Sequence, residues 1–329
     1  MLLLFLLCLI LLGGCGAGSA SDSNAGAPGE TAAVSESTIP DENSPLASLS
    51  SEKRLKGSLS SPRSRGEVLT SEVNQDKITS FDGGFADLSQ LEKGFVAVSY
   101  TSSERLKFQV KKGEETYNYD LPSNGEVTVF PLSMGNGTYE LKIMQNVGGT
   151  KYTKVWGQEV SVALLDDFQP FLRPSQIVPY SPSDPLVDKA YEISEYAASD
   201  LEIAAAVYGY LKENVTYDHE KAASVQSGYL SDPSATLISK DGICFDYASL
   251  AAAMLRSQNV PCQVIFGYVG EDELYHAWNR IYLKETGWLS VEIQVNRQDW
   301  KRVDITFAAG GTSATTLEDD ARYTNRFIY

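Results

Sequence analysis

The chain has 329 residues, and 43 acidic against 27 basic side chains give it a formal net charge of -16 at pH 7. That charge disfavours nucleic acid and anionic membrane surfaces as partners, and the length allows two domains with tails. Beyond the first fifteen residues the cysteines are Cys244 and Cys262.

The first fifteen residues have the composition of a signal peptide. The apolar run 2–12 is too short to span a bilayer, which takes about 20 residues. It ends in Leu-Gly-Gly-Cys15, which resembles a bacterial lipobox, although no basic residue precedes the run. We expect export and lipidation of Cys15, so that the protein is extracytoplasmic and anchored to the membrane by lipid; an ordinary secretory leader is the alternative.

The segment 16–77 is predicted to be a disordered linker, because its first fifty residues are mostly Ser, Ala, Gly, Glu and Pro with almost no aromatic residues. The segment 78–165 is predicted to be a small all-β sandwich module. From Leu88 to Leu165, short alternating runs are separated by turn residues, which is typical of six or seven antiparallel strands. We interpret the module as a packing or spacer unit, and the alternative is a module that binds a ligand or the cell wall.

The segment 166–329 is predicted to be the catalytic domain. A Pro-rich connector leads to a helix over about 186–197, and a capping pattern, Ser199 followed by Glu202, begins a second helix. Four alanines near the start of the segment 247–256 favour a third helix that packs closely. The final run, ARYTNRFIY, is predicted to be the last strand of a sheet.

Three side chains in this region have the types and order of a catalytic triad. Cys244 lies at the start of a predicted helix, where free amides and the helix dipole favour a thiolate. His276 lies in a predicted strand and would take the thiol proton and later return it to a leaving amine. Asp304 lies in a later strand and would orient the imidazole.

The motifs around these residues resemble the transglutaminase-like superfamily. They occur in order as GIC, VIFGY, HAW and WKRVDITF, between about Asp200 and Phe307. The resemblance implies a papain-like α+β core, with helices packed on an antiparallel sheet, and a triad of Cys244, His276 and Asp304.

Other assignments remain open from the residues alone. Glu292 follows Trp288 with the spacing at which Asp304 follows Trp300, and it could be the third member of the triad. His219 is the rival base. Cys262 could pair with Cys244, but a helix of about 13 residues would carry the chain roughly 20 Å, too far for a disulfide; a core position for Cys262 is favoured.

Other residues are candidates for the substrate cleft expected around Cys244. Tyr217 or Tyr229 could line it, although such tyrosines are more often half-buried packing residues. The backbone amide of Cys244 is expected to supply one donor to an oxyanion. No metal or other cofactor is expected, because no calcium-loop spacing occurs and the two histidines lie far apart.

The resemblance implies a thiol acyl-transfer enzyme that acts on protein or peptide amides at the cell surface. It could transfer the acyl group to an amine, as a transglutaminase does, or to water, as a cysteine peptidase or amidase of proteins or wall peptides does. The non-enzymatic alternative is a catalytically inactive transglutaminase-like module that serves in binding or assembly.

Overall fold

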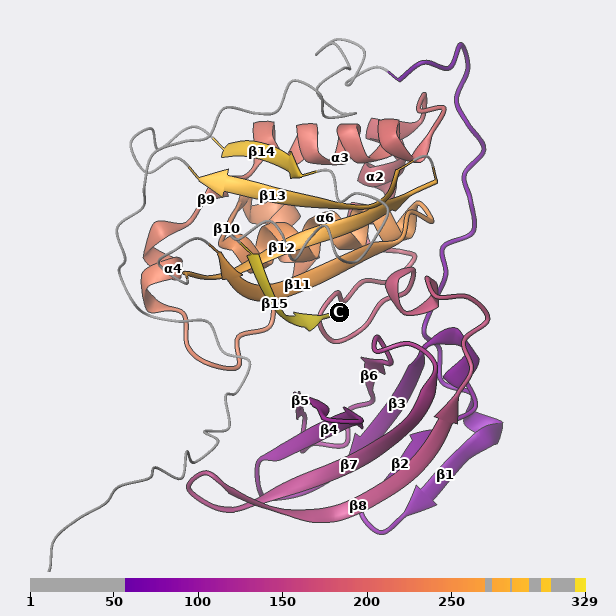
Figure 1. Cartoon of the computed structure of the whole chain (residues 1–329), viewed down its shortest axis with the longest axis vertical. Coiled ribbons are helices and arrows are strands. Elements are labelled where there is room, and N and C mark those ends of the chain that lie inside the picture. Colours follow the sequence, from indigo (N-terminus) through magenta and orange to yellow (C-terminus); the bar gives the residue numbers. More distant parts are fainter. Residues whose placement is uncertain (1–56, 270–273, 285, 296–302, 309–322) are drawn as a thin grey trace, which may run out of the picture.

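The computed structural model describes residues 57–269, 274–284, 286–295, 303–308 and 323–329. They form two units, a lower one made of strands and an upper one in which helices cover a sheet (Figure 1). The predicted α+β class, preceded by an all-β region, is confirmed. Cys15 and the predicted signal peptide lie outside the described residues.

The lower unit is a sandwich of two four-stranded antiparallel sheets, with strand orders β1-β2-β3-β6 and β5-β4-β7-β8. Buried residues alternate with half-buried ones along β4 and β5, which is typical of strands with one face on a core. The rings of Phe108 on β4 and Phe130 on β6 stack 4.5 Å apart and join the two sheets. The strands are β1 (Ile78–Phe81), β2 (Gly84–Asp87), β3 (Phe95–Tyr100), β4 (Leu106–Lys112), β5 (Glu115–Leu121), β6 (Thr128–Pro131), β7 (Gly137–Gly148) and β8 (Lys151–Val162).

The upper unit packs helices on a five-stranded antiparallel sheet of order β14-β13-β12-β11-β15. The predicted last strand is confirmed as β15, which pairs with β11 at the edge of this sheet. Its helices are α2 (Pro185–Ser194), α3 (Asp200–Asn214), α4 (His219–Ser224), α5 (Pro233–Ser239) and α6 (Cys244–Ser257). Its strands are β9 (Thr216–Tyr217), β10 (Asp241–Gly242), β11 (Cys262–Val269), β12 (Leu274–Leu283), β13 (Gly287–Val295), β14 (Val303–Ala308) and β15 (Tyr323–Ile328).

The central helix α6 is buried along almost its whole length. The alanines from 248 to 253 leave room for α2, α3 and strands β11 and β12 to pack around it. Near its end, the fully buried guanidinium of Arg256 donates to the carbonyls of Cys262, Arg173 and Tyr329 at 2.8–3.0 Å. Burial lowers the pKa of Arg256, and the three carbonyls satisfy its donors. The helix is thus fixed to both the connector and the sheet.

Of the predicted disordered linker 16–77, residues 16–56 lie outside the described residues, and residues 57–77 make specific contacts with the upper unit. Ser58 donates to the Glu202 carboxylate, and Arg63 donates to the Ser194 carbonyl and to the Gln258 side chain. The Arg63 guanidinium also lies over the ring of Tyr191, 5.3 Å from its centroid. These contacts fasten the segment along the helices of the upper unit, because its few long side chains find partners there that composition alone does not reveal.

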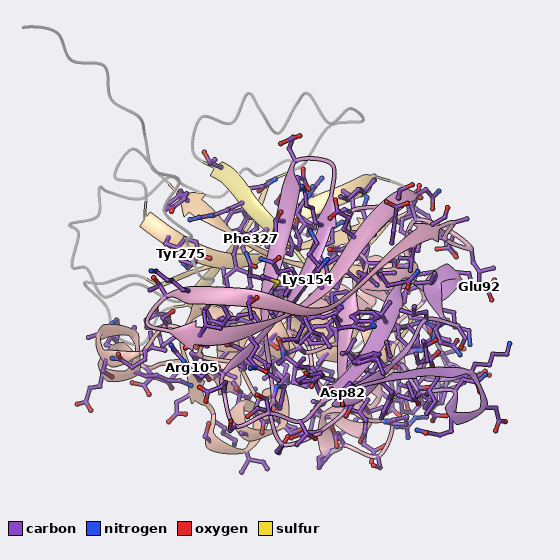
Figure 2. All side chains as sticks on the ribbon, turned by 90° about the horizontal axis from the view of Figure 1, so that it is seen from below. Asp82, Glu92, Arg105, Lys154, Tyr275 and Phe327 are labelled. Atoms are coloured by element: carbon purple, nitrogen blue, oxygen red, sulfur yellow. The ribbon has the colours of Figure 1, made fainter. Side chains whose placement is uncertain are left out.

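The two units meet where β5 approaches β15. The hydroxyl of Tyr117 accepts a hydrogen bond from the backbone amide of Ile328 at 3.1 Å. The rings of Tyr117 and Tyr119 lie 5.2–5.6 Å from those of Phe327 and Tyr329. Figure 2 looks at the molecule from the sandwich side and labels Phe327 and Tyr275 on the upper unit. Within the described residues, no helix has the length and apolarity needed to cross a membrane.

Candidate active site

Cys244 is the first residue of α6, as the sequence predicted. The preceding β10 pairs in parallel with β9, where Gly242 lies opposite Tyr217, and the Asp218 amide donates to the Gly242 carbonyl at 2.9 Å. A Cβ atom at Gly242 would lie 2.6 Å from the Cβ of Asp246, which is closer than two non-bonded carbon atoms can approach. Glycine at this position therefore lets the chain turn tightly into the helix that presents the thiol.

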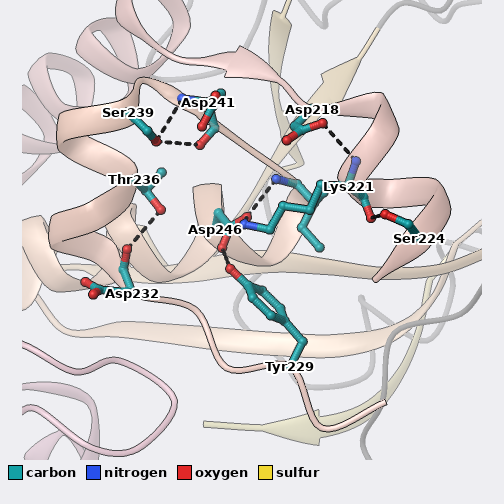
Figure 3. A network of polar contacts seen from close by, with 10 residues as sticks. Asp218, Lys221, Ser224, Tyr229, Asp232, Thr236, Ser239, Asp241 and Asp246 are labelled. Carbon is teal, nitrogen blue, oxygen red and sulfur yellow. Dashed lines mark hydrogen bonds and ion pairs between the residues drawn. The ribbon is translucent and has the colours of Figure 1, made fainter. Parts of the chain in front are cut away.

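The beginning of α6 is held by a buried carboxylate, Asp246, which is 0% exposed. One of its oxygens accepts the backbone N–H of Ile243 at 2.9 Å and the Lys221 ammonium at 2.7 Å, and the other accepts the Tyr229 hydroxyl at 2.5 Å (Figure 3). Burial and the hydrogen bond to Asp246 raise the pKa of Tyr229 to about 12, so that it stays a donor. Burial alone would lower the pKa of Lys221, but its hydrogen bonds and the charge of Asp246 raise it.

The imidazole of His276 hydrogen-bonds the thiol of Cys244. Burial alone would raise the thiol pKa, yet the charge of His276, its hydrogen bond and the backbone N–H groups of Ala277 and Phe245 together lower it. The Cys244 residue as a whole is partly exposed. A partly exposed cysteine with a depressed thiol pKa and a paired imidazole is the arrangement that nucleophilic catalysis by cysteine requires.

His276 is placed by the pairing of β12 with β11, in which it lies opposite Gly267. A Cβ atom at Gly267 would lie 2.0 Å from the Thr324 carbonyl oxygen and 2.8 Å from the indole of Trp278. The glycine therefore allows β15 and the buried Trp278 to close on this part of β11. The glycine of the VIFGY motif thus has a packing role beside the histidine strand.

The third member of the predicted triad is described only through its backbone. Asp304 lies on β14 opposite Gln294 of β13, and Glu292 of β13 lies opposite Thr306. In the sheet, β13 stands between β12, which carries His276, and β14. The strand of Glu292 is therefore the direct neighbour of the histidine strand, and the strand of Asp304 lies one strand farther, at about 10 Å. The choice of Asp304 over Glu292 stays a prediction.

The structure also places the other candidate residues of the sequence. His219 opens α4, and its ring lies 4.9 Å from that of Tyr217; it is absent from the lining of the cleft that contains Cys244. Cys262 is a free, fully buried residue at the start of β11, so the core position predicted for it is confirmed. Among the residues that the structure describes, no group of three or more His, Cys, Asp or Glu side chains could hold a metal ion.

A single cleft is lined by both Cys244 and His276. Its floor is aromatic: the rings of Phe245 and Phe266 lie 4.8 Å apart, and those of Phe266 and Tyr329 lie 5.7 Å apart. Tyr229, one of the two tyrosines considered as possible lining residues, also lines it. The mixture of aromatic and polar walls fits a site for part of a polypeptide or a comparable organic substrate.

Sequence reasoning missed two residues of this site, Asp246 and Lys221. The signal for Asp246 was present, because an acid three residues into a helix can accept the backbone N–H of the residue before it. Lys221 gave no such signal, since it is one of many lysines and meets Asp246 only through the folding of α4 onto α6.

Comparisons with known proteins find a family match in the part of the chain that holds this site. Residues 187–293 match the family described as "Transglutaminase-like superfamily"; this range contains Cys244, His276 and Glu292 and ends before Asp304. A stretch of 56 residues is 36% identical to the UPF0252 protein MJ1282 of Methanocaldococcus jannaschii and covers 16% of this chain. It also covers 16% of that protein, so the match spans about a sixth of the curated relative.

Among solved structures, a "Putative Cysteine Protease" from Cytophaga hutchinsonii is 18% identical, with 70% of this chain and 80% of that chain covered at a TM-score of 0.34. Red sea bream transglutaminase is 11% identical, with 61% and 48% covered at a TM-score of 0.26. The chain carries a transglutaminase-like domain at residues 187–293.

Proposed function

We propose that the protein is an extracytoplasmic thiol acyl-transfer enzyme that acts on protein or peptide amides with Cys244, His276 and Asp304. The observation that supports this most is the thiol of Cys244, which is hydrogen-bonded by His276 and by two backbone amides and has a lowered pKa. Shifted pKa values of this kind cluster at functional sites, which favours an enzyme over a catalytically inactive binding module.

The chemistry follows from these groups. The Cys244 thiolate attacks the amide carbonyl and forms a C–S bond, and backbone amides near the start of α6 stabilise the oxyanion. His276, protonated by the thiol, gives its proton to the leaving nitrogen as the C–N bond breaks, which leaves a thioester. An amine or a water then attacks the thioester carbonyl while His276 takes its proton, the C–S bond breaks, and His276 returns the proton to the Cys244 thiolate. Transfer and hydrolysis therefore differ only in the second nucleophile.

The test uses the purified protein with two reporters on casein, incorporation of dansylcadaverine and release of fluorescein-labelled fragments. Amine incorporation that disappears in Cys244→Ala supports a transglutaminase, and fragment release with the same dependence supports a peptidase. If neither occurs and the unchanged protein reacts with iodoacetamide no faster than glutathione at pH 7, the enzyme proposal is wrong and a binding module remains.

The third member of the triad is tested by Asp304→Asn beside Glu292→Gln, two substitutions that each remove one negative charge. We expect Asp304→Asn to reduce kcat by about 10² to 10⁴ through loss of the orienter, with Glu292→Gln near the unchanged value. The reverse pattern would transfer the role to Glu292.

Membrane anchorage through a lipid on Cys15 is part of the same proposal and rests on the Leu-Gly-Gly-Cys sequence. Cells fed an alkyne-bearing palmitate should label the protein, and Cys15→Ala should lose the label and release the protein from the membrane fraction. Equal labelling of both forms would contradict the anchor.

A further inference from the structure

The sandwich contributes directly to the cleft. Three consecutive residues of β5, Asn118, Tyr119 and Asp120, line it together with Cys244 and His276. β5 is the edge strand of its sheet, with β4 as its neighbour on one side. Among the described residues, the side of β5 away from β4 therefore has no strand partner, and the strand borders the cleft that contains Cys244.

The direction of the outer backbone groups of β5 can be inferred from one hydrogen bond. The carbonyl of Asp120 accepts from the Gln176 side chain at 2.5 Å, outside the β4–β5 pairing, so it points away from β4. Backbone groups in an antiparallel strand repeat their direction every second residue. The N–H and C=O of Asn118 therefore also point away from β4, on the side of the cleft.

The opposite side of the cleft is close to β5. A Cβ atom at Gly228 would lie 3.3 Å from a carboxylate oxygen of Asp120, which shows how near the loop that carries Tyr229 comes to the strand. The ring of Tyr119 lies 5.6 Å from that of Tyr329 on the cleft floor. An extended chain lying along β5 would therefore have an aromatic floor beneath it and the thiol of Cys244 within the same cleft.

We propose that β5 is the docking strand for the substrate, which binds as an extended polypeptide that adds to the edge of the sandwich and pairs with the backbone of Asn118. This inference rests on the proposed function and names its substrate class: an unfolded or extended segment of a protein, rather than a folded surface or a free amino acid.

The experiment compares two reagents with the same reactive group on the whole protein. Chloroacetone needs only the thiol, while Ala-Ala-Phe chloromethyl ketone also needs a place for its peptide. The ratio of their second-order rate constants toward Cys244 therefore measures the contribution of the cleft walls, independent of the reactivity of the thiol.

Two variants change β5 in different ways. Asn118→Pro removes the outward N–H, which an edge strand tolerates because that group does not pair with β4. Asn118→Trp leaves the backbone and fills the cleft. The matched control is Gln109→Ala on β4, which removes the same 2.8 Å hydrogen bond between the side chains of Gln109 and Asn118 without touching the lining.

We expect the ratio to fall about three- to tenfold in Asn118→Pro, the value of one net hydrogen bond, and at least as far in Asn118→Trp. The chloroacetone rate should stay within about twofold in all three variants, and Gln109→Ala should keep the original ratio. An unchanged ratio in both Asn118 variants overturns the docking strand. A chloroacetone rate no faster than that of glutathione in the unchanged protein overturns the proposed function, which is a separate observation.

Discussion

Cys244, at the start of α6, and Cys262, at the start of the following strand β11, lie in opposite chemical environments. Cys262, after the helix, is fully buried on β11, and burial raises its pKa to about 12 despite the nearby charge of Arg256. Cys244, the first residue of the helix, also experiences burial, yet its pKa is lowered by His276 and two backbone amides. Burial acts on both thiols, so the opposite directions of the two pKa shifts come from the imidazole and the amides beside Cys244.

The largest expected effect comes from removing each thiol in turn. Cys244→Ala should abolish activity, by a factor of at least about 10³, and remove fast labelling by iodoacetamide. Cys262→Ala should keep both and lower the free energy of unfolding by about 1–2 kcal/mol, because it leaves a small cavity. Mass spectrometry of the labelled peptides and a urea titration measure the two effects. Fast labelling at Cys262 would contradict the comparison.

Removal of the imidazole should make Cys244 more like Cys262. In His276→Ala only burial and the amides remain, so the thiol pKa rises and the alkylation rate at pH 6 falls by about tenfold for each unit gained. The lowered pKa predicts that the unchanged protein keeps its reactivity as the pH drops below the ordinary thiol range. Alkylation rates from pH 5 to 9 measure this, and His219→Ala, which lies outside the cleft lining, should follow the curve of the unchanged protein.

A smaller effect should follow from weakening the support of the helix start. Asp246→Asn leaves an acceptor for the Ile243 amide but removes the charge that pairs with Lys221. We expect the free energy of unfolding to fall by about 1–3 kcal/mol, limited because the Lys221 side chain is 32% exposed and can turn to water.

The control for Asp246 is Asp232→Asn. Asp232 also accepts a helix amide, that of Ala235, but it is exposed, and asparagine caps a helix about as well. A change within about 0.5 kcal/mol is expected there in the same urea titration. Equal losses at both positions would show that burial and Lys221 add nothing.

The smallest effect concerns the left-handed residues ahead of the two cysteines. Lys240, at φ 61, precedes the turn to Cys244, and Asn259, at φ 63, precedes β11. Lys240→Gly should raise the free energy of unfolding by about 1 kcal/mol, because glycine adopts this conformation without strain. Asn259→Gly should give no gain, since asparagine tolerates the region and its side chain donates to the Glu67 carbonyl. Thermal unfolding of the two variants separates these outcomes.

Much of the site was predictable because its signals are local. A glycine and a cysteine before an alanine-rich run indicated the start of a helix, and the HAW run indicated a strand, so Cys244 and His276 could be named before their contact was known. The Ser199 cap was likewise visible, and its side chain accepts the Glu202 amide at 3.2 Å.

The rest depended on contacts between distant parts of the chain. The approach of β5 to Cys244 joins residues more than a hundred positions apart, and nothing in the run TYNYDLP indicates it. Composition predicted disorder for 57–77 because it counts apolar residues, whereas Ser58 and Arg63 are held by polar contacts with helices far along the sequence. The sequence placed an extra strand between His276 and Asp304, as the order β12, β13, β14 has it, but it could not show whether Asp304 or Glu292 reaches the imidazole.

The course of the chain through residues 57–77 has a mechanical consequence. That segment is fixed on the upper unit, the chain then forms the whole sandwich, and it returns to the upper unit through the connector after β8. The sandwich is therefore joined to the upper unit by two stretches of chain, which restrict its rotation more than a single linker would. A pull on the N-terminal end would load the helices first and leave the cleft aligned.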